Sequence, residues 1–83
     1  MSTPGFSKTY ASTGALSEDI NLFEEGEKQI PVRLRIGIGG TLHVGYFDGK
    51  EDTIAYQSGD VEEAQFKTIK ADGSSAQMIT VYW

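Results

Sequence analysis

The sequence predicts an all-β protein, a small antiparallel β-sandwich or barrel of about six strands that follows an extended N-terminal arm. Two observations favour this fold. Apolar and polar residues alternate over most of the chain beyond residue 17, and turn sequences rich in glycine and aspartate recur every 8 to 12 residues, roughly. No segment requires a helix. The 83 residues suffice for one small domain, which we expect to span residues 18–83 after an arm of residues 1–17.

The composition of the first 17 residues favours an arm. They include seven Ser or Thr residues, two Gly and one Pro, and their apolar side chains follow neither a helical nor a strand period. One interpretation is a flexible tail. The other is that Phe6, Tyr10 and Leu16 order on a partner surface, as segments that fold on binding do.

The strand pattern is clearest over residues 32–39, where every second residue is aliphatic and the others are arginine or glycine. A shorter alternating segment covers residues 20–22. After Gly39-Gly40 the alternation resumes over residues 41–47, which predicts a second strand of the same sheet.

The second half of the chain reads as strands separated by turns. Asp48-Gly49 predicts a hairpin that leads into a strand over residues 53–56, because tight hairpin turns need positive φ. Residues 61–70 also fit one face of a helix, but their β-branched residues favour a strand with a bulge. A turn at residues 71–75 precedes a final strand at residues 76–83.

Charge and composition exclude several classes of function. The chain has 7 Lys+Arg against 12 Asp+Glu, a formal charge of −5, which repels nucleic acid and anionic lipid, so we expect neither as a partner. The absence of cysteine excludes disulfides, thiolate metal sites and a cysteine nucleophile. No run approaches the ~18 apolar residues of a membrane-spanning helix.

The glycine-rich run at residues 37–40 could suggest a phosphate-binding loop. That chemistry needs a helix N-terminus after the glycines, whereas a strand is predicted here, so a tight strand connection is favoured. His43, the sole histidine, has no nucleophile at a recognisable spacing and points away from the apolar side of its strand. We expect it to be a surface or interface residue.

Carboxylates cluster in two turns, around residues 24–27 and residues 48–52. Either cluster could bind a hard cation, but neither has the twelve-residue calcium-loop pattern, and solvated turns are favoured. No pair of carboxylates stands on a buried strand face, as glycoside hydrolysis would need. We therefore expect no catalytic residues, no metal site and no cofactor, and a protein that is not an enzyme.

The final strand is apolar on both faces, because Met78 and Tyr82 alternate with Ile79, Val81 and Trp83. Either the domain covers both faces or one face meets a neighbouring chain. The second alternative is favoured for so small a sheet, since aromatic residues are enriched in interfaces. With the anchors of the arm, the predicted interface residues are Phe6, Tyr10, Leu16, Ile79, Val81, Tyr82 and Trp83.

Two motifs carry a resemblance to a known family. The first, in residues 35–44, places Gly37, Gly39, Gly40 and Leu42 in a strand-glycine pattern. The second comprises Lys70, Ala71, Gly73, Ser74, Ser75 and Ala76, followed by a hydrophobic strand that ends on an aromatic residue. Over roughly residues 30–83 the chain resembles small head-surface proteins of tailed phages, including the head-spike base proteins of phages and gene transfer agents. It departs from their pattern at residues 58–64, which contain no proline.

This resemblance implies a non-enzymatic structural protein of the virion, made in the host cytoplasm and placed on the phage head. It would act as a capsid decoration or cement protein or as a head-spike base. Its partners would be the major capsid protein or other virion proteins, and it would form a small homo-oligomer, a trimer or pentamer. The alternative function is a small carbohydrate- or ligand-binding β module with Tyr46, Tyr56, Tyr82 and Trp83 as stacking platforms.

Overall fold

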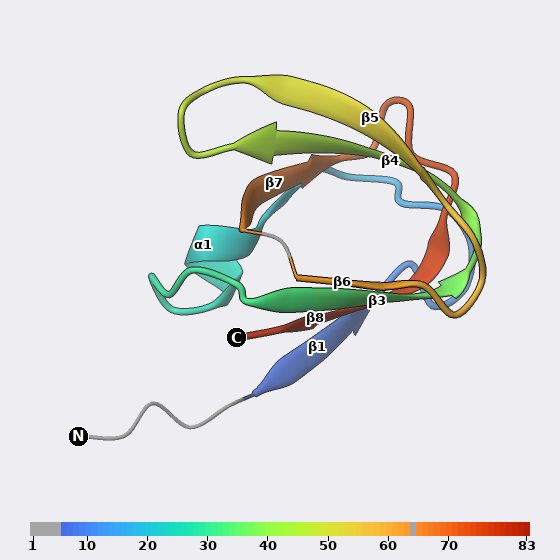
Figure 1. The fold of residues 1–83 in the computed structure, drawn as a ribbon, viewed down its shortest axis with the longest axis horizontal. Helices are drawn as coiled ribbons and strands as arrows, with labels where there is room; N and C mark the ends of the chain where they lie inside the picture. The colour runs from blue at the N-terminus through green and yellow to red at the C-terminus, as the bar shows by residue number, and fades with distance from the viewer. Residues whose placement is uncertain (1–5, 64) are drawn as a thin grey trace.

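The computed structural model describes residues 6–63 and 65–83 of the chain. It consists almost entirely of two four-stranded antiparallel sheets that pack against each other (Figure 1). The prediction of a small β-sandwich is confirmed, and the described residues form no closed barrel.

Each sheet contains strands that are distant in the sequence. Sheet A has the strand order β1-β8-β3-β6, formed by Ser7–Tyr10, Gln77–Tyr82, Arg33–Ile38 and Val61–Glu62. Sheet B has the order β2-β7-β4-β5, formed by Ile20–Asn21, Phe66–Lys70, Gly40–Tyr46 and Glu51–Tyr56. All neighbouring strands are antiparallel.

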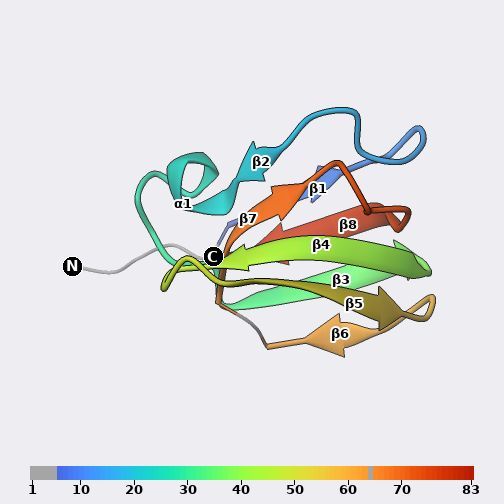
Figure 2. The same cartoon turned by 90° about the horizontal axis from the view of Figure 1, so that it is seen from above.

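Four connections between the sheets, β1 to β2, β3 to β4, β5 to β6 and β7 to β8, gather at one end of the sandwich (right in Figures 1 and 2). The β3 to β4 connection is the tightest, because only Gly39 separates the two strands. A Cβ atom on Gly39 would lie 2.9 Å from the carbonyl oxygen of Tyr56. On Gly40 it would lie 2.7 Å from the backbone nitrogen of Ala76. The run of glycines therefore serves close packing of backbones, and it leads into a strand as predicted. The prediction that this strand lies in the same sheet as β3 is wrong, because the connection crosses from sheet A to sheet B.

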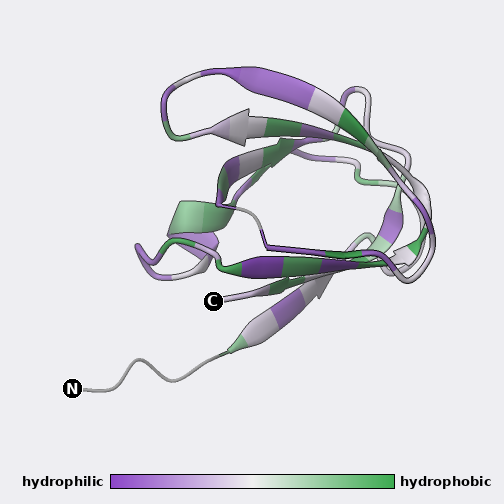
Figure 3. Ribbon diagram, in the orientation of Figure 1, coloured by the Kyte–Doolittle hydropathy of each residue, from purple (hydrophilic) through white to green (hydrophobic). Residues whose placement is uncertain are grey.

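The core follows the predicted alternation. Figure 3 shows hydrophobic and hydrophilic residues alternating along β3, and Leu34 and Ile36 are buried there. Val32 and Ile38, on the same face but at its ends, are 51% and 47% exposed. The core residues are Leu22, Leu34, Ile36, Leu42, Val44, Tyr56, Phe66, Ile69, Ala76, Ile79, Val81 and Trp83.

Part of the predicted arm belongs to the sandwich. Residues 7–10 form β1, an edge strand that pairs with β8 from Ser7↔Tyr82 to Tyr10↔Ile79. This segment is extended, as expected, but it lies on its own domain because β8 offers it a free edge. Residues 1–5 of the predicted arm lie outside the described residues.

Two local elements differ from the prediction. Leu22–Glu25 form one helical turn, α1, capped by the Asn21 side chain, which accepts a hydrogen bond from the Glu24 backbone N–H at 3.1 Å. So short a helix leaves no periodic signal. Residues 61–70 form two strands, one in each sheet, because the chain crosses between the sheets after Glu62. The predicted irregularity is present where β7 pairs with β4, with a register shift between Gly45 and Tyr46.

Within the described residues, no helix is long and apolar enough to cross a membrane.

Candidate contact surface

The outer face of sheet A gathers side chains suited to protein contact. We call it the arginine face. Residues that pair in register share a face, and Arg33 pairs with Tyr82 while Arg35 pairs with both Thr80 and Val61. The face consists of Thr9, Arg33, Arg35, Val61, Met78, Thr80 and Tyr82.

The arginine face concentrates positive charge on an acidic protein. It holds both arginines of a chain whose formal charge is −5. Arg33 lies over the Tyr82 ring, 5.0 Å from its centroid. Within residues 6–63 and 65–83, neither arginine forms an ion pair. Both are therefore available to an acidic partner.

Apolar side chains flank these arginines. Val61 is 56% exposed and Met78 is 42% exposed. Arginine, tyrosine and methionine are enriched in protein interfaces, whereas lysine and glutamate dominate ordinary solvated surface. The chemistry of the arginine face is thus that of a contact surface.

The predicted interface residues of the last strand divide between the two faces of β8. Tyr82 points outward onto the arginine face, where Arg33 covers it. Ile79 and Val81 are fully buried and Trp83 is 7% exposed, all within the core of the domain. We therefore remove these three from the candidate interface. β8 lies between β1 and β3, and its inner face packs on sheet B, so the domain itself covers that side.

Trp83 is held within its own domain by two hydrogen bonds and a ring contact. Its indole Nε1–H donates to the Leu22 carbonyl oxygen at 3.0 Å, and its ring stacks on Phe6 with centroids 5.1 Å apart. Its backbone N–H donates to the Phe6 carbonyl oxygen at 2.9 Å. Trp83 thereby ties both ends of the described chain to α1.

The predicted anchors of the arm also lie against this core. Phe6, Tyr10 and Leu16 are half-buried and pack on the domain's own hydrophobic residues. The Tyr10 hydroxyl donates to Glu25 Oε1 at 3.1 Å, and the Lys8 ammonium contacts the same oxygen at 2.7 Å. Burial, followed by the hydrogen bond to Glu25, raises the pKa of Tyr10 above its ordinary value. The hydrogen bond from Lys8, followed by that from Tyr10, lowers the pKa of Glu25.

The four aromatics of the carbohydrate-binding alternative do not form one platform. Trp83 and Tyr56 are buried, at 7% and 9% exposure. Tyr46 belongs to sheet B and packs edge-on against Phe66, whereas Tyr82 belongs to sheet A. The two partly exposed rings therefore lie on different sheets.

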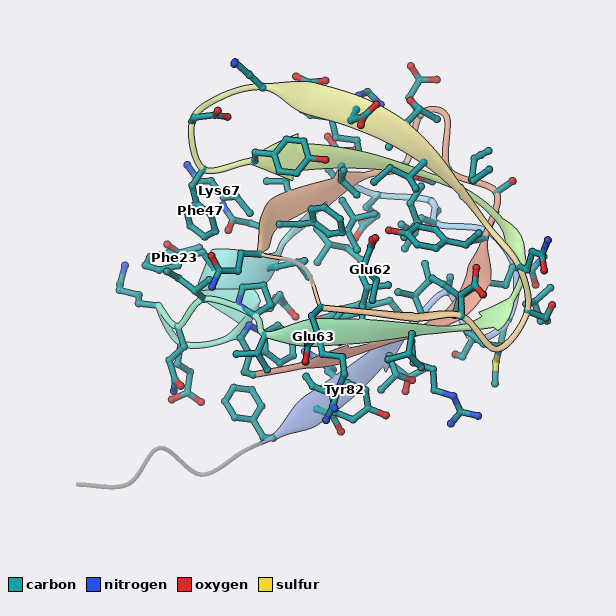
Figure 4. All side chains as sticks on the ribbon, in the orientation of Figure 1. Phe23, Phe47, Glu62, Glu63, Lys67 and Tyr82 are labelled. Carbon is teal, nitrogen blue, oxygen red and sulfur yellow. The ribbon has the colours of Figure 1, made fainter. Side chains whose placement is uncertain are left out.

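A second surface of interest is a groove of about 260 Å³ at the open side of the sandwich, between β5 and β6. We call it the acidic groove. Figure 4 shows Glu62 pointing into the space between the sheets, where its carboxylate accepts a hydrogen bond from the Tyr56 hydroxyl. The groove is lined by Tyr46, Ile54, Glu62, Glu63, Gln65 and Phe66.

The electrostatic character of the acidic groove is visible at Tyr46. Burial raises the pKa of the Tyr46 hydroxyl, and the negative charges of Asp52, Glu62 and Asp48 raise it further. The rings of Tyr46 and Phe66 and the side chains of Glu62 and Glu63 line the groove together. Such a site favours a cation with an apolar stem.

A larger hollow of about 410 Å³ lies beneath the loop of residues 11–19, between β1 and β2. Hydroxyl and carboxylate groups, among them those of Ser12, Thr13 and Glu18, line it. No group of three metal-ligating side chains is found there or elsewhere among the described residues. Of the carboxylates that cluster in the sequence, Glu27 and Asp48 lie in turns, Glu24 and Glu25 belong to α1, and Glu51 and Asp52 belong to β5.

His43 connects three segments at the outer face of sheet B. Its Nδ1–H donates to the Asp72 carbonyl oxygen at 2.8 Å, and its Nε2–H donates to Glu51 Oε1 at 2.6 Å. Both partners are acceptors, so the doubly protonated ring satisfies both hydrogen bonds. The Asp72 carbonyl, followed by the Glu51 carboxylate, raises the pKa of His43 above 6.5.

We expect an NMR titration of the sole histidine to give a pKa above 6.5. Glu51→Gln should lower this pKa part of the way, because the Asp72 carbonyl remains. Since the folded pKa is the higher one, the stabilisation from His43 is fully present below the unfolded pKa and disappears as the pH rises through the folded pKa. Equal pKa values in wild type and Glu51→Gln would show that the contact with Glu51 does not form in solution.

The arginine face has a partial signal in the sequence. The alternation of Leu34 and Ile36 with Arg33 and Arg35 places the two arginines together on the outer side of a strand. Alternation alone does not show that β8 and β6 are the neighbours that add Tyr82, Met78 and Val61. The acidic groove has no local signal, because its residues come from four separate strands, β4 to β7.

Comparison with protein-family models, curated proteins and solved structures finds no match to this chain. Inference about function therefore rests on the surfaces described above and on the two motifs within residues 30–83. The structure places these motifs in contact. Ser75 Oγ accepts from the Thr41 backbone N–H at 3.0 Å, and Ser74 Oγ accepts from the His43 backbone N–H at 2.9 Å.

Proposed function

We propose that this protein is a non-enzymatic structural component of a tailed-phage virion. It acts on the head surface, as a capsid decoration or cement protein or as a head-spike base, through contacts with capsid proteins and with further copies of itself. The observation that carries the proposal is the arginine face, an exposed sheet surface with the composition of a protein interface.

The segments that carry the two family-like motifs support the proposal because they contribute to this face. The first motif supplies Arg35 and Gly37 of β3, and the strand after the second motif supplies Met78, Thr80 and Tyr82 of β8. A Cβ on Gly37 would lie 2.5 Å from Cβ of Met78. Glycine at this position of β3 therefore leaves room for the Met78 side chain on the neighbouring strand β8. Of the motif residues themselves, Gly37 lies on this face, whereas the others lie in the β3–β4 connection, in sheet B and in the turn before β8.

Purification of particles tests the proposal. Virions from cells that carry the gene, banded in a density gradient and washed in high salt, should contain the chain in a fixed ratio to the major capsid protein by quantitative mass spectrometry. Antibody labelling should place it on the head. Particles that lack the chain after banding, despite its expression in the same cells, would contradict the proposal.

A further inference from the structure

We propose that the acidic groove of one copy receives the arginine face of a second copy, with Arg35 as the anchoring side chain. The two copies then join head to tail. This inference rests on the proposed function for its role, since it describes the contact between subunits on the particle.

The groove has the chemistry that a guanidinium group requires. Glu62 and Glu63 line it, and the Asp48 and Asp52 carboxylates act on Tyr46 at its side. Carboxylates bind the planar arginine fork through paired hydrogen bonds, and aromatic rings attract the cation over their faces. The rings of Tyr46 and Phe66 stand at this position.

The arginine face supplies a matching group. Arg33 already lies over Tyr82, whereas Arg35 stands between Thr80 and Val61, whose side chains are short. Arg35 is exposed, and no carboxylate in the described part of the chain forms an ion pair with it. Its aliphatic stem and that of Met78 can cover the rings that line the groove.

Charge favours the head-to-tail arrangement over a symmetric one. Contact between two arginine faces would bring four guanidinium groups together, and contact between two acidic grooves would bring carboxylates together, so both symmetric arrangements are repulsive. The face and the groove of different copies bring opposite charges together. Every further copy of the chain carries the same acidic groove and can therefore serve as the acidic partner. The formal charge of −5 makes the chain poorly suited to bind nucleic acid.

The two surfaces lie on either side of β6. In this two-residue strand Val61 belongs to the arginine face, while Glu62 points into the groove. They therefore face different directions on one molecule. A head-to-tail contact between such surfaces generates a ring if the rotation closes.

The experiment uses the purified full chain and light scattering after size exclusion over a range of concentrations. Wild type is expected to form an oligomer. Arg35→Glu should raise the dissociation constant at least tenfold, and Asp52→Lys/Glu63→Lys should do the same from the other side. Lys67→Glu, which makes the same charge change as Arg35→Glu at an exposed site of β7, should assemble as wild type does. Circular dichroism melting curves establish that each variant is folded.

A mixture of two interface variants identifies the arrangement. For this mixture the two surfaces are neutralised, because a negative face and a positive groove would attract each other. The intact groove of Arg35→Ala should accept Arg35 of Asp52→Asn/Glu63→Gln, and the neutralised surfaces at the ends of the pair no longer attract further copies. The expected product is a 1:1 heterodimer and nothing larger. A mixture in which no 1:1 complex forms would overturn the proposal.

The outcomes separate this inference from the proposed function. A wild-type chain that stays monomeric at millimolar concentration, or an Arg35→Glu variant that assembles normally, overturns the inference. Presence of the chain in banded particles would still support the function in that case. Self-association of a chain that is missing from particles would support the contact and contradict the function.

Discussion

Replacement of Trp83 by alanine is expected to lower the free energy of unfolding by about 3–5 kcal/mol. The substitution removes a ring that is 7% exposed, its stacking on Phe6 and its hydrogen bond to the Leu22 carbonyl. The carbonyl oxygen loses a partner and the core acquires a cavity. Small domains have a total stability of only about 5–15 kcal/mol, so a measurable unfolded fraction can appear without denaturant.

Urea unfolding followed by far-ultraviolet circular dichroism measures this effect, since the variant has no tryptophan for fluorescence. Tyr82→Ala is the matched control on the neighbouring position, where the side chain points outward, and it should cost about 1 kcal/mol or less. Trp83→Phe should fall between the two, because it retains an aromatic ring and loses the N–H donor. Equal midpoints for Trp83→Ala and Tyr82→Ala would contradict the burial of Trp83.

Gly26→Ala is expected to destabilise the domain by about 1–3 kcal/mol, as overpacking of a filled core does. A Cβ at this position would lie 2.1 Å from Nε1 of Trp83, although the backbone φ of −87° suits alanine. The indole must therefore shift and weaken its hydrogen bond to Leu22. Thermal and urea unfolding of the variant measure the loss.

A double-mutant cycle separates this steric cause from an effect on α1. In the Trp83→Ala background the space beside Gly26 is free, so Gly26→Ala should be neutral or stabilising by up to about 1 kcal/mol, because alanine restricts the unfolded chain. An unchanged cost in that background would show that Gly26 is needed for the helix end and not for Trp83.

Alternation predicted the strands of the sandwich because a residue period of two leaves its mark within a few residues. The strands around Leu34 and Leu42 and the hairpin at Asp48-Gly49 are found where the pattern places them. The glycine run was identified as a connection because the alternation stops at Gly39-Gly40 and resumes directly after it. In contrast, α1 rests on a single side-chain cap at Asn21, and β1 rests on pairing with a strand about 70 residues away in sequence.

The candidate surfaces could be predicted only in part. The sequence placed Arg33 and Arg35 on one side of a strand and identified the last strand as apolar on both faces. It offered no means of choosing which face of that strand lies inward, since Ile79, Val81 and Trp83 are as apolar as an interface requires. This face of β8 is buried because it packs on sheet B, whose Leu42, Val44 and Ile69 complete the core.

The sequence by itself thus determined the all-β class, the alternating core positions, the turns and the acidic balance, because these depend on neighbouring residues and on composition. The tertiary structure alone decided that Trp83 is a core residue held by Phe6 and Leu22 and that residues 7–10 belong to a sheet. It also decided that Arg35 shares a face with Thr80 and Val61. These features depend on strand order across two sheets, which pairs residues far apart in the chain, and the energy of such long-range contacts leaves no local pattern.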